Sequence, residues 1–151
     1  MTEPPHGHRG EQARVRVFTV MIADLFHFGH VRLLRNARAL GDHLTVGLVT
    51  DRRAMSYKRR PVMTYEERKA VLENSRYVDA VIPLDENVTN DFMVKHDFQI
   101  RAYAVASDAD EERFFQTLWK DMDRDYFVRV AYTEEVSTTD IIARVRGRGD
   151  L

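Results

Sequence analysis

The residues best suited to chemistry are two histidines that bracket a glycine, in the segment Asp24-Leu25-Phe26-His27-Phe28-Gly29-His30. The segment follows an apolar, strand-like run and precedes an amphipathic stretch, so it joins a strand to a helix. Gly29 has no side chain and lets the backbone approach a ligand, while the first N–H groups of a helix attract anions. Imidazoles there can donate hydrogen bonds to oxygens that gain charge during phosphoryl transfer. The segment therefore predicts a phosphate-binding turn in which His27 and His30 are catalytic.

A metal site is the alternative for the same turn. Asp24, His27 and His30 could supply a set of two histidines and one carboxylate, although no further ligand-rich segment accompanies them. His6 and His8 could also bind a metal, but residues 1–12 are rich in Pro, Gly, His and charge without periodicity. Such a composition favours a flexible tail before one domain that covers residues 13–151.

Composition excludes several classes of protein. The 151 residues are 44% hydrophobic and 31% charged, and 23 basic against 24 acidic residues give a net charge of -1. Near-neutrality argues against a nucleic-acid-binding surface, and the absence of cysteine excludes disulfides, thiolate zinc sites and a cysteine nucleophile. No apolar run approaches the roughly 20 residues of a membrane span, and the N-terminus lacks the apolar core of a signal peptide. We expect a cytoplasmic protein without membrane association.

The basic residues are unevenly distributed. Five of the 23 lie between Arg52 and Arg60, in a segment that is expected to be a loop. A local basic loop on a neutral chain favours a small anionic ligand over a polymer. Guanidinium groups at Arg59 and Arg60 would suit bidentate binding of a phosphate or phosphonate group.

Short apolar runs alternate about five times with longer amphipathic stretches, which predicts an α/β, Rossmann-like fold: an open, mostly parallel sheet of about five strands with helices on both faces. Ligands in such folds bind beyond the carboxyl ends of the strands.

Capping boxes are predicted at Thr64 with Glu67 and at Ser137 with Asp140. Arg68, on the helix after Thr64, is expected at the surface. The expected strands are 15–22, 44–49, 80–83, 103–106 and 126–132, and the expected helices are 30–40, 64–74, 90–96, 111–122 and 137–145.

The chain resembles the small cytidylyltransferases, the glycerol-3-phosphate cytidylyltransferase group with its phosphocholine and phosphoethanolamine relatives. His27-Phe28-Gly29-His30 matches the HxGH segment of these nucleotidyltransferases. The likeness covers about residues 15–145 and continues at Tyr65-Glu66-Glu67-Arg68, Arg76-Tyr77-Val78-Asp79 and Ser137-Thr138-Thr139. The HxGH segment is shared with adenylyltransferases, whereas the Arg-Tyr-Val-Asp block favours the cytidylyl branch.

The resemblance implies a Mg²⁺-dependent transfer of CMP from CTP to a small anionic acceptor, with glycerol 3-phosphate as the default, and a homodimer contact at the Arg76 block. His27, His30 and the loop lysine Lys58 would be catalytic, Asp24 would orient the turn, and Arg59, Arg60 and Tyr132 would contact the acceptor. The implied nucleotide-binding residues are Met21, Ile22, Ala23, Asp24, Gly29, Arg76, Ser107, Asp108, Ser137, Thr138 and Thr139.

Three segments depart from the family pattern. Met21-Ile22-Ala23-Asp24 replaces Gly-Thr-Phe-Asp, Tyr132-Thr133-Glu134-Glu135 replaces Arg-Thr-Glu-Gly, and Ser107-Asp108-Ala109-Asp110 stands for Gly-Asp-Asp-Trp. These changes leave the acceptor open. The leading alternative is a phosphonate such as hydroxyethylphosphonate or phosphonoformate. Rival interpretations are an adenylyltransferase on the same fold and a nucleotide-binding regulator without catalytic activity.

Overall fold

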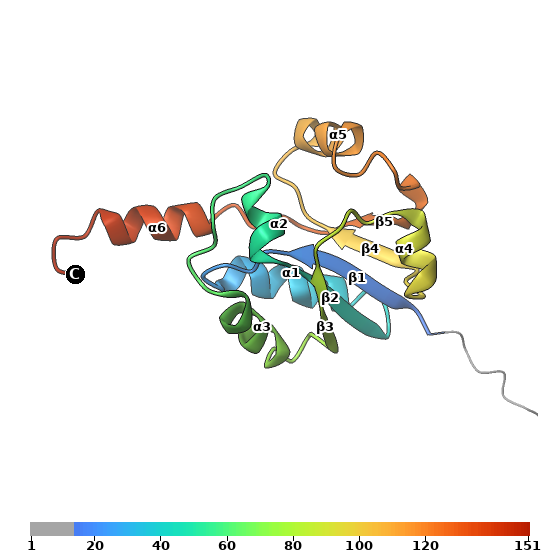
Figure 1. Ribbon diagram of the computed structural model, residues 1–151, viewed down its shortest axis with the longest axis horizontal. Helices are drawn as coiled ribbons and strands as arrows, with labels where there is room; N and C mark the ends of the chain where they lie inside the picture. The colour runs from blue at the N-terminus through green and yellow to red at the C-terminus, as the bar shows by residue number, and fades with distance from the viewer. Residues whose placement is uncertain (1–13) are drawn as a thin grey trace, which may run out of the picture.

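The computed structural model describes residues 14–151, so the predicted tail with His6 and His8 lies outside the described residues. Five strands form one sheet in the order β3-β2-β1-β4-β5, and every neighbouring pair is parallel (Figure 1). The predicted α/β, Rossmann-like class is confirmed. The strands are β1 (Arg16–Met21), β2 (His43–Val49), β3 (Ala80–Leu84), β4 (Ile100–Tyr103) and β5 (Phe127–Arg129).

Helices cover both faces of the sheet (Figure 1). Leu34 of α1 and Leu72 of α3 are fully buried in one core, and Ala54 of α2 packs with Phe92 of α4 in the other. The last helix, α6, extends away from the sheet towards the C-terminus. The helices are α1 (Phe28–Arg38), α2 (Asp51–Met55), α3 (Tyr65–Glu73), α4 (Asn90–Lys95), α5 (Asp108–Gln116) and α6 (Thr138–Arg146), with a 3₁₀ turn at Arg124–Tyr126.

The helix starts follow from local hydrogen bonding. Thr64 Oγ1 accepts from the Glu67 backbone N–H at 3.3 Å, and the Glu67 carboxylate accepts from the Thr64 N–H at 2.8 Å. Ser137 Oγ accepts from the Asp140 N–H at 3.1 Å at the start of α6. The predicted capping box is therefore complete at Thr64, whereas at Ser137 only the cap by the hydroxyl forms, because the Asp140 carboxylate accepts from Ser137 Oγ at 2.7 Å.

Several boundaries differ from the sequence-based expectations. The fourth strand covers residues 100–103 instead of 103–106, because the buried Arg101 interrupts the apolar pattern of that strand. Helix α5 begins earlier than expected, after the cap Ser107, and ends at Gln116, so that Trp119 packs outside the helix. The basic loop contains the short helix α2, capped by Thr50, and the last strand covers only 127–129.

No helix in residues 14–151 is long and apolar enough to cross a bilayer.

Candidate active site

The chain leaves β1 through a strained turn centred on Asp24. Ala23 and Leu25, on either side, have φ angles of 55° and 48°, a left-handed conformation that residues with a Cβ rarely adopt. Asp24 is 5% exposed, and its two carboxylate oxygens accept from the Val62 and Met63 N–H groups at 2.9 Å each. The Asp24 carbonyl accepts from Thr138 Oγ1 at 3.0 Å. This one residue therefore joins the end of β1, the loop before α3 and the start of α6.

The two histidines of the HxGH segment form a reciprocal cap on α1. His27 Nδ1 accepts from the Gly29 N–H, and His30 Nδ1 accepts from the His27 N–H, each at 3.1 Å. The imidazole ring centroids are 3.9 Å apart. A Cβ added at Gly29 would lie 2.9 Å from Cε1 of His27, so the glycine is needed for the His27 ring to occupy this position. Since a neutral imidazole carries its proton on the nitrogen that does not accept, both rings have Nε2–H as their free donor.

Burial keeps these imidazoles neutral. It lowers the pKa of His30 to about 4, with a further lowering by the nearby His27 that Asp24 partly opposes. Burial also lowers the pKa of His27. At neutral pH both side chains are therefore hydrogen-bond donors without a charge of their own.

A cavity of about 510 Å³, the β1 cavity, opens at the carboxyl end of β1. His30 enters it from the first turn of α1, and Ser137 to Thr139 line it at the start of α6, so two helix N-termini border it. Lys58 and Arg59 supply positive charge, and Arg59 Nη1 lies 3.4 Å from Thr139 Oγ1. Neutral donors, helix N-termini and two cations together favour an anionic ligand with several oxygens. The complete lining is Val20, Met21, Ile22, Ala23, Asp24, His30, Leu33, Lys58, Arg59, Pro61, Ser137, Thr138 and Thr139.

The structure brings most of the predicted site residues to this cavity. Ten of them line it: Met21, Ile22, Ala23, Asp24, His30, Lys58, Arg59, Ser137, Thr138 and Thr139. His27 lines a separate hollow and contacts His30, while Gly29 lies in the cap between them. The hollow also includes Glu135, which pairs with Arg32 of α1 at 3.5 Å.

The remaining predicted residues lie apart from the β1 cavity. Ser107 caps α5, and the exposed Asp108 pairs with Arg129. Arg60, Arg76 and Tyr132 are exposed and are not part of its lining. Their predicted contacts with ligands remain predictions.

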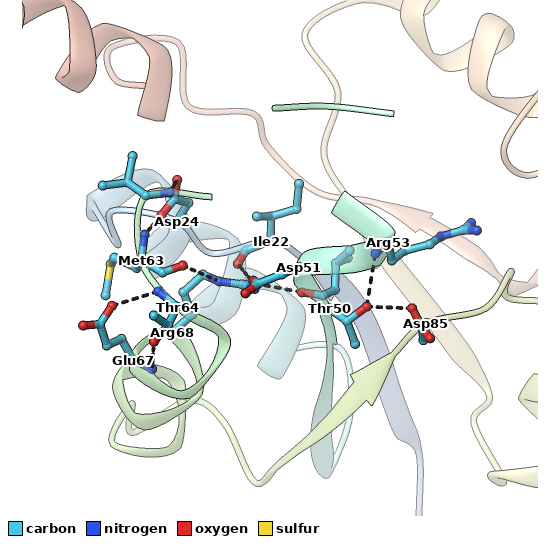
Figure 2. A network of polar contacts seen from close by, with 12 residues as sticks. Ile22, Asp24, Thr50, Asp51, Arg53, Met63, Thr64, Glu67, Arg68 and Asp85 are labelled. Carbon is cyan, nitrogen blue, oxygen red and sulfur yellow. Dashed lines mark hydrogen bonds and ion pairs between the residues drawn. The ribbon is translucent and has the colours of Figure 1, made fainter. Parts of the chain in front are cut away.

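Arg68 is a positioning residue that the sequence interpretation placed wrongly at the surface. It is 0% exposed, and its Nη1 donates to the Ile22 carbonyl at 2.7 Å and to the Val49 carbonyl at 2.9 Å. Nη2 pairs with Asp51 at 2.6 Å (Figure 2). The guanidinium therefore holds together the carboxyl ends of β1 and β2, directly behind the cavity. A usable signal was its spacing, because Arg68 lies four residues before the buried Leu72 on the same face of α3.

Within residues 14–151 no cluster of three or more His, Asp or Glu side chains is placed to hold a metal ion. The hydrogen bonds of the two histidines also conflict with a metal held by Asp24, His27 and His30. Nδ1 of each ring already accepts a backbone N–H, so the neutral ring carries its proton on Nε2, the other nitrogen that could bind a metal.

Comparison with known proteins agrees with this geometry. The family model described as cytidylyltransferase-like matches residues 22–144. The glycerol-3-phosphate cytidylyltransferase of Staphylococcus aureus is 35% identical over 133 residues, which cover 88% of this chain and 96% of that protein. The ethanolamine-phosphate cytidylyltransferase of Mus musculus is 34% identical over 90% of this chain, which spans only 34% of that longer protein.

A solved structure supports the fold. The lipopolysaccharide core biosynthesis protein of Thermoplasma volcanium superimposes with a TM-score of 0.66 at 22% identity, over 81% of this chain and 100% of that one. Together, the matched family model, the relative of similar length and the HxGH turn at the end of β1 show that the chain belongs to the cytidylyltransferase-like family.

Proposed function

We propose that the protein transfers CMP from CTP to a small phosphate-bearing acceptor, such as glycerol 3-phosphate, and releases pyrophosphate. The observation that carries the proposal is the pair of neutral imidazoles at the start of α1: His30 lines the β1 cavity, His27 lies against it, and each ring has its proton on Nε2. The names of the relatives support cytidine nucleotides and phosphorylated alcohols as substrates.

The reaction is a displacement at the α-phosphorus of CTP. An oxygen of the acceptor phosphate attacks, a new P–O bond forms to the CMP group, and the bond to the departing pyrophosphate breaks. The attacking oxygen is already anionic at neutral pH, so no general base is needed. The protein contributes alignment and hydrogen-bond donors to oxygens that gain charge in the transition state.

The polar groups that line the β1 cavity, and His27 next to His30, each have a role in this scheme. The Nε2–H groups of His27 and His30 donate to the phosphate oxygens. Lys58 and Arg59 neutralise the triphosphate from the opposite loop, and the start of α6 at Ser137 to Thr139 presents hydroxyl and N–H donors.

A Mg²⁺ ion in this scheme would be carried by the substrate, because the described lining of the β1 cavity offers it few ligands. Asp24 is the one carboxylate among the described lining residues, and both its oxygens already accept backbone N–H groups. The ion would be held by the phosphate oxygens of CTP with Asp24 beside it, and would offset their negative charge.

The direct test is pyrophosphate release by purified protein with CTP, Mg²⁺ and glycerol 3-phosphate, with ethanolamine phosphate and 2-hydroxyethylphosphonate as further acceptors. We expect release that requires both substrates and falls sharply when ATP replaces CTP. Efficient release with ATP instead would identify an adenylyltransferase. CTP binding without release with any acceptor would indicate a non-catalytic nucleotide-binding protein.

Substitution of the histidines tests the chemical role. His27→Ala and His30→Ala should each lower kcat about a hundredfold, the scale of losing one preorganised donor. His43→Ala, at the opposite end of the sheet, is the matched control and should keep kcat near wild type. A near-normal kcat in His27→Ala or His30→Ala would remove that residue from the chemistry.

A further inference from the structure

A second cavity of about 650 Å³, the α5 cavity, lies between the sheet and the segment that contains α5. It adjoins the β1 cavity, because Val20, Met21, Ile22, Leu33 and Lys58 line both. Lys58 is the one Lys or Arg side chain that the linings of the two cavities share. A molecule in the α5 cavity would therefore reach the place where the phosphate chemistry is proposed.

The lining of the α5 cavity includes a buried arginine, Arg101. It projects from β4, is 7% exposed and lines the cavity. Its guanidinium carbon lies 5.4 Å from the ring centroid of Trp119 and 5.1 Å from that of Phe127. Its one described hydrogen bond is from Nη1 to the sulfur of Met122 at 2.9 Å, and a thioether is a weak acceptor.

No carboxylate in residues 14–151 forms an ion pair with Arg101. Glu111, which accepts from Tyr103 on the same face of β4, is also paired with Arg129 at 3.1 Å. Burial lowers the pKa of Arg101 to about 10, which still leaves it charged at neutral pH. A buried cation of this kind is costly unless an anion compensates it, and the flanking aromatic rings compensate it only in part.

The other charges around the α5 cavity are mostly positive. Arg53, Lys58 and Arg113 line it together with one carboxylate, Glu86. Arg113 is already paired with Asp110 at 2.9 Å. The side chains of Phe114, Leu118 and Trp119 form an apolar wall beside Arg101. This combination suits a short carbon chain with an anionic group at each end.

We propose that Arg101 binds a carboxylate of the acceptor, so that the acceptor is a phosphate or phosphonate with a carboxylate at its other end. The reacting oxyanion would lie near Lys58, at the junction of the two cavities, and the carboxylate would reach the guanidinium of Arg101. The planar fork of a guanidinium matches the two oxygens of a carboxylate. This inference rests on the proposed function and narrows its acceptor.

Two pairs of compounds test the proposal on the wild-type protein, because the members of each pair differ only by a carboxylate in place of a hydroxymethyl group. They are 3-phosphoglycerate against glycerol 3-phosphate, and phosphonoacetate against 2-hydroxyethylphosphonate. With CTP and Mg²⁺, kcat/KM for pyrophosphate release should be at least about tenfold higher for the carboxylate in at least one pair. Equal or better use of the alcohol in both pairs would overturn the proposal.

Two variants test whether Arg101 is the residue that causes the preference for a carboxylate. Arg101→Met should reduce the carboxylate-to-alcohol ratio of kcat/KM to about one. Arg124→Met is the matched control, because Arg124 stacks on Phe115 outside the cavity lining, and it should leave the ratio unchanged. An unchanged ratio in a folded Arg101→Met would assign the preference to another residue and contradict the proposal.

Calorimetry separates this inference from the proposed function and does not depend on the variant folding. Wild-type protein without nucleotide should bind the carboxylate at least about fivefold more tightly than the matching alcohol in at least one pair, for example 3-phosphoglycerate against glycerol 3-phosphate. This preference can appear even if no acceptor supports pyrophosphate release, in which case the proposed function fails and the anion site stands. The same comparison is made with phosphonoacetate and 2-hydroxyethylphosphonate, and equal affinities within both pairs would overturn the anion site itself.

Discussion

The chemistry of this protein depends on how backbone N–H groups fix two side chains. His27 and His30 both use Nδ1 as an acceptor, so their orientation and tautomer are set before any substrate arrives. The types and spacing of these residues were sufficient to predict the turn. Sequence could not predict that both would be neutral, because the pKa of His30 is lowered mainly by the atoms that bury it.

The low pKa of His30 predicts a pH-dependent stability. The unfolded chain binds a proton at this group near pH 6.5, whereas the folded protein does so only near pH 4. Its contribution to stability is therefore complete above about pH 6.5, falls progressively below that pH, and is fully lost once the pH has fallen through about 4. Between pH 7.5 and 5.0 the free energy of unfolding should fall by about 2 kcal/mol more in wild type than in His30→Asn.

Urea unfolding at the two pH values measures this difference. The amide oxygen of asparagine can replace Nδ1 as an acceptor, which makes His30→Asn a suitable reference. Parallel losses of stability in the two proteins would show that His30 is not held neutral by folding.

Because Ala23 lies in a strained turn, we expect its substitution by glycine to cost little stability. Ala23 has a φ of 55°, which costs an L-residue about 1 kcal/mol that glycine avoids. Ala23→Gly should therefore change the free energy of unfolding by less than about 0.5 kcal/mol, since the relieved strain offsets the lost methyl group and the added chain entropy.

Ala37→Gly is the matched control, because Ala37 is also buried but lies in regular helix α1. It should destabilise by about 1 kcal/mol or more in the same denaturation experiment. Equal destabilisation by the two substitutions would contradict strain at Ala23.

At the scale of elements, the site is assembled by contacts between segments that are far apart in the sequence. Asp24 receives N–H groups from the loop before α3, and Arg68 connects the ends of β1 and β2 (Figure 2). Capping residues predicted where α3 and α6 begin, whereas α1 begins at Phe28, two residues before the predicted start, because His27 caps it. The same patterns misplaced β4, because a buried arginine reads as a surface residue in any pattern based on polarity.

Removal of Arg68 should loosen this assembly. Arg68→Met leaves the carbonyls of Ile22 and Val49 without their buried donor and should lower the free energy of unfolding by about 3–5 kcal/mol. Arg38→Met is the matched control: Arg38 pairs with Asp79 at 3.1 Å but is about one third exposed. Its loss should cost less than about 1 kcal/mol. Similar losses in the two variants would show that Arg68 does not clamp the strands.

At the scale of the whole molecule, the near-zero net charge conceals a concentrated cationic rim. Lys58 and Arg59 face the N-terminal ends of α1 and α6 across the β1 cavity, while Arg53, Arg101 and Arg113 surround the α5 cavity next to it. The count of basic residues along the sequence located the basic segment. Only the fold shows that Arg101 and Arg113, which are distant in the sequence, lie at the same cavity as residues of that segment.

The segment at Arg76 leads into β3, which lies at one edge of the sheet. The family resemblance implies a homodimer at this segment. We therefore expect sedimentation equilibrium to give twice the 17.6 kDa mass of one chain. Arg76→Glu should weaken the dimer, and Arg144→Glu on α6 should not. A monomeric wild-type protein at micromolar concentration would contradict this expectation.

The central claim is that the β1 cavity joins CMP to an acceptor phosphate or phosphonate. Phosphorus NMR of protein incubated with CTP, Mg²⁺ and each of glycerol 3-phosphate, 3-phosphoglycerate and phosphonoacetate observes that bond directly. The account predicts, for at least one acceptor, two mutually coupled phosphorus signals of a new P–O–P linkage together with an equal amount of pyrophosphate, and neither signal at a comparable rate in His30→Ala. Unchanged CTP with every acceptor, or hydrolysis to CMP without the coupled pair, would contradict it.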